Sequence, residues 1–455
     1  MNFSDTLFDT NDISTVRGSS RAYEDAVGGF VGDKDTLLDL GASKVVLKSD
    51  RAIEEIIAGA DAKLMSRLSF VCGEGPTIAE AEAQARGKQF RNWTVTGSTE
   101  AGSVPCALDG ARSAARESQP KGLVSNTVHD RREYGRDQRS RLYGDATVWK
   151  DFTVSTEFAQ LVESPPKGLA FGAHNKIAVI HADGSGFGDA LKALESEKGD
   201  EGRAEFSNAL RALQADLLAR IGEWLKEVEK NTARRALSNH EPETPRFETL
   251  LFGGDDMDFV LPGWLAIPFI AKFSQITGNW EIGGVALSHR LACVIANVKT
   301  PIRQLRGFAH DAVDELRSLP RSNVFSIDLL ESAAPPADGP SAHRKRLFGA
   351  SITPEHTAFS LTKARALEET LDSLSQNADA PENLRRSQIH TLLDWLSDLA
   401  SDEASDELKR RHEGYRLRVT DGGESVLPEL PGLEAPASLH LAMIAQLWDF
   451  AGAMS

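Results

Sequence analysis

Three aspartates follow a double-glycine turn and could bind a divalent cation. Gly253 and Gly254 separate two apolar runs, and Asp255, Asp256 and Asp258 come directly after them. Paired glycines accept the positive φ angles of two-residue turns, so this segment predicts a β-hairpin. Crowded carboxylates repel one another, and a bound divalent cation would relieve that repulsion. The alternative is an ordinary polar turn, which Gly-Gly-Asp sequences often form.

Asp183 offers a partner for this acidic hairpin. It stands at the end of a short β-branched strand over residues 177–180, and the segment that leads into a helical region consists of Gly184, Ser185, Gly186, Phe187 and Gly188. Hard-oxygen ligands beside open backbone suit Mg²⁺-assisted phosphoryl or nucleotidyl transfer. A dinucleotide-binding loop is disfavoured, because the Gly-x-Gly-x-Gly spacing lacks a residue before the third glycine.

These segments resemble the palm domain shared by nucleotidyl cyclases of the GGDEF type and by the large polymerase-cyclase subunit of type III CRISPR effector complexes. Residues 183–188 match the first metal-binding segment of that subunit, residues 253–256 its GGDD hairpin, and residues 283–302 the next strand, loop and helix start. The resemblance covers roughly residues 167–330. It implies an α+β fold: a ferredoxin-like palm with an antiparallel sheet and helices on one face, plus a C-terminal helical domain.

The resemblance also implies roles for the acidic residues. Asp183 and Asp255 would bridge two Mg²⁺ (or Mn²⁺) ions, the carbonyl of Gly184 would complete the coordination shell, and Asp256 would assist as a ligand or proton acceptor. The nucleotide would lie against the backbone of residues 184–188 and of Gly253 and Gly254. The sequence departs from the family at Ser185, where many relatives carry an acidic or amide side chain, and in lacking a Cys-x-x-Cys zinc motif.

Two cations near a predicted helix start could reach a triphosphate. Lys299 and Arg303 flank Pro301, and Lys299 is the preferred phosphate ligand. The competing interpretation makes Arg303, Arg306 and Arg317 solvated residues of an amphipathic helix. His181 is expected to be a hydrogen-bonded structural residue rather than a catalytic one.

Composition narrows the classes of partner. The net charge of −16 argues against binding a long nucleic acid, because contacts to phosphates require surplus Lys and Arg. Three scattered cysteines and the lack of a leader or membrane-spanning stretch predict a cytoplasmic protein without a membrane partner. The basic segment 129–141 is diluted by acids and is interpreted first as a salt-bridged helix or loop, and second as a ligand-sensing surface.

The 455 residues suggest several domains. Residues 1–30 are expected to form a mobile polar arm. Residues 31–150 alternate strand and helix patterns as a small α/β domain, which the resemblance makes a degenerate first palm. Residues 151–332 hold the palm. Residues 333–355 form a Pro-rich linker, and the amphipathic stripes of residues 356–455 predict a helical bundle.

Two functions follow as hypotheses. The first is a nucleotidyl transferase or cyclase that makes a cyclic mono- or oligonucleotide from an NTP, with ATP preferred, in antiviral defence signalling. Closing a ring usually takes two palms, so a homodimer or a partner palm protein is expected. The second is a palm-fold nucleotide sensor or scaffold with little or no turnover, which Ser185 favours.

Overall fold

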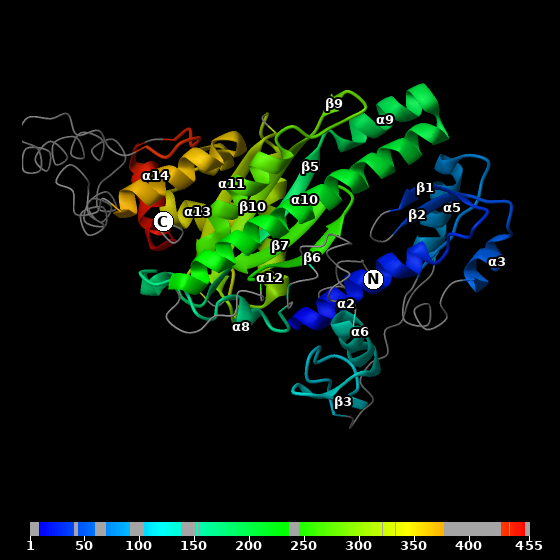
Figure 1. Ribbon diagram of the computed structural model, residues 1–455, viewed down its shortest axis with the longest axis horizontal. Helices are drawn as coiled ribbons and strands as arrows, with labels where there is room; N and C mark the ends of the chain where they lie inside the picture. The colour runs from blue at the N-terminus through cyan, green and yellow to red at the C-terminus, as the bar shows by residue number, and fades with distance from the viewer. Residues whose placement is uncertain are drawn as a thin grey trace, which may run out of the picture.

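A six-stranded mixed sheet forms the centre of the computed structural model (Figure 1). The structure describes residues 9–40, 44–59, 70–91, 104–137, 149, 152, 155–235, 245–320, 322–332, 334–376, 429–435 and 437–450. The strands run in the order β12-β11-β10-β5-β7-β6 and span Phe359–Ser360, Val324–Leu330, Ser288–Asn297, Lys176–Ser185, Asp256–Pro262 and Glu248–Gly253. Only β10 and β11 are parallel among these neighbours; the other pairs are antiparallel.

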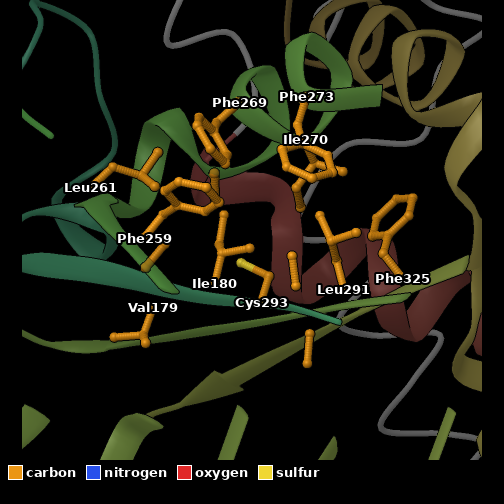
Figure 2. Close-up of a cluster of buried hydrophobic side chains, with 14 of the residues drawn as sticks. Val179, Ile180, Phe259, Leu261, Phe269, Ile270, Phe273, Leu291, Cys293 and Phe325 are labelled. Atoms are coloured by element: carbon orange, nitrogen blue, oxygen red, sulfur yellow. The ribbon is translucent and has the colours of Figure 1, made fainter. Parts of the chain in front are cut away.

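The central strands β5 and β10 are apolar along most of their length because both of their faces are covered. Residues of β5 alternate between the two faces, and Figure 2 shows Val179 and Ile180 projecting to opposite sides. On the Ile180 side, Phe259 contacts Phe269 and Phe273, with ring centroids 5.1 and 6.1 Å apart. This aromatic group anchors α11 on the sheet.

Helices cover both faces of this sheet. The helix α11 (Ala266–Thr277) lies on the Ile180 face, and α10 (Asp200–Arg235) packs against α11. The helix α12 (Ile302–Arg317) lies on the Val179 face, where its His310 ring meets that of His181. The expected α+β fold is therefore confirmed, but two details of the expectation are wrong: one strand pair is parallel, and the helices are not confined to one face.

Helices α9 (Phe187–Lys198) and α10 form an antiparallel pair between the two acidic segments, as the helical pattern after residue 188 predicts. A small hairpin of β8 (Glu281–Ile282) and β9 (Val285–Ala286) lies beside α9 (Figure 1). No helix in the described part of the chain has both the length and the apolarity needed to cross a membrane.

The N-terminal helix α2 (Ile13–Gly28) closes the β6 edge of the sheet. Its Arg17 is fully buried and donates from Nε to Oε1 of Glu248 on β6 over 3.1 Å. The expectation of a mobile arm over residues 1–30 is therefore wrong for this helix, because Arg17 and several other polar side chains of α2 are buried against the rest of the protein. Residues 1–8 lie outside the described residues.

The remaining N-terminal residues form small elements around α2. These are β1 (Thr36–Leu40), β2 (Val45–Lys48), α3 (Ile53–Ala58), α5 (Ile78–Arg91), β3 (Arg116–Ser118), β4 (Gly122–Val124), α6 (Asn126–Asp137) and α8 (Phe158–Leu161). The described strands pair as β1–β2 and β3–β4 only. The assignment of residues 31–150 to a degenerate palm stays a prediction.

The basic segment 129–141 falls largely on α6, and its described part is a salt-bridged helix, as expected. Arg131 binds Asp9 over 2.9 Å and Arg132 binds Asp12 over 3.2 Å, and both arginines are buried. Residues 138–141 lie outside the described residues. Buried, paired guanidiniums are not offered to a ligand, so the described part of this segment is a packing element.

Two C-terminal expectations need correction. The predicted linker 333–355 contains the helix α13 (Gly339–Phe348), whose Arg344 is buried and bonded to Asp328 over 2.8 Å. The segment after residue 356 is not wholly helical, because β12 pairs with β11. Of the predicted bundle, α14 (Ala364–Gln376) and α17 (Ala437–Leu447) are described and join the main hydrophobic core. Residues 377–428 of the predicted bundle lie outside the described residues.

Candidate active site

The predicted acidic hairpin is formed by β6 and β7. Gly253 pairs with Asp256, which leaves Gly254 and Asp255 as a two-residue turn, and Gly254 adopts a φ of 66°. This left-handed conformation is what glycine supplies at low steric cost. Gln214 of α10 donates a 2.8 Å hydrogen bond to the carbonyl of Gly254 and so fixes the turn against α10.

The structure brings Asp183, Asp255 and Asp256 together. Asp183 on β5 and Asp256 on β7 are direct cross-strand partners, so their side chains share one face of the sheet. Asp255 remains in the turn, and its carbonyl accepts a 3.1 Å hydrogen bond from the Gly184 backbone N–H. The predicted meeting of two distant acidic segments is therefore present. Asp256, to which the family resemblance gives only an assisting role, is the one directly opposite Asp183.

A side chain would not fit at Gly184, the first residue of the glycine-rich segment after Asp183. A Cβ atom on Gly184 would lie 2.5 Å from the Phe187 ring and 2.7 Å from Cβ of Asp255. Gly186 has a φ of 90° and turns the chain from β5 into α9. Phe187 is buried, so only its backbone can face a ligand, whereas Gly188 is exposed with open space beside it.

The acidic cluster carries more negative charge than its surroundings compensate. Partial burial, with a contribution from the neighbouring charge of Asp183, raises the pKa of Asp255. Burial also raises the pKa of Asp256, and the charges of Asp255, Asp183 and Asp258 act in the same direction. Among the described residues, neither Asp255 nor Asp256 has an ion-pair partner. Both carboxylates would gain from a nearby cation.

Arg317, in the last turn of α12, holds Asp183. Its Nε donates to Oδ2 of Asp183 over 3.2 Å, and its Nη2 donates to Oδ1. Its Nη1 donates to Oδ1 of Asp314 over 2.6 Å. The Asp183 side chain is 8% exposed and that of Arg317 is 47% exposed, so a half-exposed guanidinium covers a buried carboxylate.

Arg290 is a second cation at the site. It is the direct partner of Asp183 on β10, so the cross-strand row Asp256, Asp183 and Arg290 runs along one face of three adjacent strands. Its Nε lacks a hydrogen-bond partner in the part of the chain that the structure describes. Sequence reasoning missed this residue, because its position depends on the register between two strands far apart in the chain.

Behind the acidic cluster lies a buried charged network. Asp258 accepts hydrogen bonds from Nε of Arg306 and pairs with Nδ1 of His181 at 2.7 Å. Burial alone would raise the pKa of Asp258, but Arg306 and His181 outweigh it and lower the pKa to about 2. His181 is thus the structural residue that the sequence indicates, and Arg306 is bonded rather than freely solvated.

Lys299 and Arg303 lie at the wrong end of the sheet. Asn297, just before Lys299, pairs with Lys176 at the start of β5, whereas Asp183 lies near its end. At about 3.3 Å per residue, these two ends are roughly 20 Å apart. We therefore withdraw both residues as phosphate ligands.

The topology explains the error. A parallel β10-α12-β11 crossover carries the chain back along the sheet, so the end of α12, not its start, returns to Asp183. This brings Arg317 to the site. Recognising β10 and β11 as parallel neighbours is the signal that would have identified this arginine.

The donor set fits a hard divalent cation in its chemistry. Carboxylate oxygens and the Gly184 carbonyl are ligands that Mg²⁺ and Mn²⁺ prefer, and the raised pKa values of Asp255 and Asp256 mark uncompensated charge. In the present arrangement, however, the three described groups whose ligand atoms converge within 4.8 Å of one another are His310, Asp311 and Asp314 on α12.

Comparisons with known proteins show the fold. No protein-family model matches the chain, and no curated protein matches it. Solved structures do. The chain is similar to Csm1 from T. onnurineus, with a TM-score of 0.52 and 12% identity over 98% of this chain and 68% of that chain. It is also similar to a Csm1-Csm4 cassette in complex with cA4, with a TM-score of 0.51 and 12% identity over 99% and 68%. A Csm1-Csm4 cassette in complex with pppApApA gives a TM-score of 0.50, 12% identity and coverage of 99% and 68%. The chain therefore shares its overall fold with Csm1.

Proposed function

We propose that this chain is a Mg²⁺- or Mn²⁺-dependent nucleotidyl transferase or cyclase that uses an NTP, with ATP as the first candidate. One observation carries the proposal: Asp183 and Asp256 face each other across β5 and β7, with Asp255 in the adjoining turn. The similar cassette structures hold cA4 and pppApApA, and pppApApA is a chain of adenylates by its formula. That likeness supports an adenine nucleotide as substrate.

The carboxylates would supply the metal ligands. Asp183, Asp255 and Asp256, with the carbonyl of Gly184, would hold the ions, which would activate the attacking 3′-hydroxyl and neutralise the leaving pyrophosphate. The exposed backbone at Gly188, in the first turn of α9, would receive phosphate oxygens, because amide N–H groups at a helix start are free to donate.

The phosphate-binding cations differ from those expected. Arg317 and Arg290 flank Asp183 and replace Lys299 and Arg303 in this role. Guanidinium groups bind phosphate oxygens in pairs, which orients a triphosphate more firmly than a single ammonium does. Gln214 acts indirectly, because it holds the turn that presents Asp255.

A partner is part of the proposal. The similar cassettes contain Csm1 with Csm4, so a protein partner or a second copy of this chain would complete the assembly, and a second palm would help to close a cyclic product. Antiviral signalling is the setting that this fold supports.

A nucleotide sensor without turnover remains a second candidate. The pairing of Asp183 with Arg317 favours it, because both carboxylate oxygens are already bonded. A sensor would need charge neutralisation at this position and no metal.

The test is incubation of the purified protein with each of the four NTPs and Mg²⁺ or Mn²⁺, with products resolved by mass. We expect release of pyrophosphate and a linear or cyclic adenylate from ATP, and loss of both in Asp183→Asn. Asp216→Asn, an exposed α10 acid paired with Arg220, is the matched control and should remain active. Unchanged NTPs together with saturable nucleotide binding would favour the sensor over the enzyme.

A further inference from the structure

We propose that Arg317 is an exchangeable counter-ion, which holds Asp183 while the site lacks nucleotide and transfers to the triphosphate when metal enters. Metal binding would then depend on nucleotide. This inference rests on the proposed function, because it assumes that Asp183 is a metal ligand.

The first argument is the occupancy of Asp183. Arg317 donates to both carboxylate oxygens of Asp183, from Nε to Oδ2 over 3.2 Å and from Nη2 to Oδ1. A metal ligand must present a free lone pair in the right direction, and a bidentate guanidinium takes that position. Consistent with this, the ligand atoms of the three aspartates are not among the described groups that converge within 4.8 Å.

The second argument is that Arg317 can leave. Its side chain is 47% exposed, and it belongs to the last helical turn of α12, before the exposed residue Ser318. Arg306, on the same helix, is only 11% exposed and is bonded to the fully buried Asp258, so it is fixed. A half-exposed guanidinium exchanges partners at lower desolvation cost than a buried one.

The third argument is that the Arg317 guanidinium has alternative partners close to the site. Asp314 holds Nη1 of Arg317 over 2.6 Å and is itself about half exposed. Asp314 would keep the guanidinium near the site after Asp183 releases it. The released Nε and Nη2 donors would match two oxygens of one phosphate. Electrostatics also favours the exchange, because a metal ion beside Arg317 would repel its guanidinium while a triphosphate would attract it.

The test measures Mn²⁺ binding by calorimetry and by electron paramagnetic resonance, without nucleotide and with a non-hydrolysable ATP analogue. We expect wild type to bind Mn²⁺ weakly alone and more tightly with the analogue. Arg317→Gln should bind Mn²⁺ alone roughly tenfold more tightly than wild type, the order expected for losing one charge-assisted bidentate pair. It should bind the analogue less tightly. Arg317→Lys, which keeps the charge without the fork, should fall between the two.

Two controls separate the alternatives. Arg346→Ala removes an arginine of α13 whose exposure is similar to that of Arg317 and which pairs with Asp338, and it should leave Mn²⁺ binding unchanged. The double variant Asp183→Asn with Arg317→Gln should lose the tighter binding. If the double variant keeps it, the extra ion binds elsewhere, as at the His310, Asp311 and Asp314 group, and the exchange is refuted.

The remaining outcomes distinguish this inference from the proposed function. Equal Mn²⁺ affinity of wild type and Arg317→Gln without nucleotide, with normal binding when the analogue is present, would overturn the exchange and leave the enzyme proposal standing. Absence of Mn²⁺ binding to wild type even with the analogue would overturn both.

Discussion

Two aspartates on one strand should respond to the same substitution with opposite changes in stability. Asp256 and Asp258 lie two residues apart on β7 and face the same side of the sheet. The pKa of Asp256 is raised and that of Asp258 is lowered to about 2. We therefore expect Asp256→Asn to stabilise the metal-free protein and Asp258→Asn to destabilise it.

The magnitudes follow from the surroundings of each carboxylate. Two bare charges about 5 Å apart repel by roughly 3 kcal/mol at an effective dielectric constant of 20, and Arg317 offsets much of this for Asp183. Asp256→Asn should therefore gain about 1 kcal/mol. For Asp258, a pKa of about 2 in place of 3.8 corresponds to roughly 2 kcal/mol. Leaving Arg306 and His181 without their shared carboxylate should bring the loss to about 3–5 kcal/mol.

The assay is thermal unfolding in EDTA at pH 8, repeated with Mg²⁺. The raised pKa of Asp256 means that its charge opposes folding above that pKa and ceases to do so as pH falls through it. The advantage of Asp256→Asn should accordingly disappear in acid. When a non-hydrolysable ATP analogue is added together with saturating Mg²⁺, the order should reverse, because only wild type gains fully from the ion, by about 2.7 kcal/mol at a hundredfold excess over Kd. If Asp256→Asn is less stable than wild type in EDTA at pH 8, the account of the acidic cluster is wrong.

Two further predictions concern packing around the site. Gly184→Ala should abolish the proposed nucleotidyl transfer and lower the free energy of unfolding by about 1–3 kcal/mol, because its Cβ would collide with Phe187 and Asp255. Gly188→Ala, where the space is open, should change the free energy of unfolding by no more than about 1 kcal/mol. Equal melting temperatures for both variants would contradict this prediction. Arg17→Ala should lower the free energy of unfolding by about 3–5 kcal/mol because it leaves Glu248 buried without its cation, and the apolar double change Arg17→Met with Glu248→Leu should restore most of it; a double variant no better than the single would show that the pair is not the cause.

Local sequence patterns predicted the elements that carry the acids. The double glycine specified the turn at Gly254, and the β-branched run specified the strand that ends beyond Asp183. Both signals are short-range, because backbone freedom and alternation act within a few residues. The meeting of the two segments came from the family resemblance and is present in the structure.

Long-range register set what the patterns could not predict. Arg290 reaches the site only because β10 pairs with β5 in one particular register, and Arg317 reaches it only because the crossover after β10 runs back along the sheet. The position of Lys299 close to a helix start in the sequence carries no information about which end of the sheet that helix start occupies. Helix α2 is rich in polar residues, which predict exposure, but several of these side chains are buried in the fold.

The closure of the β6 edge by α2 has a consequence for anyone who wishes to isolate the domain built on the six-stranded sheet. A chain that begins after residue 30 would lack the helix that covers β6, the outermost strand. It would also leave the buried Glu248 carboxylate without its Arg17 partner. Unpaired backbone along that margin would invite self-association of the fragment. Helix α2 is thus part of the packed structure around the sheet, and an expressed fragment should include it.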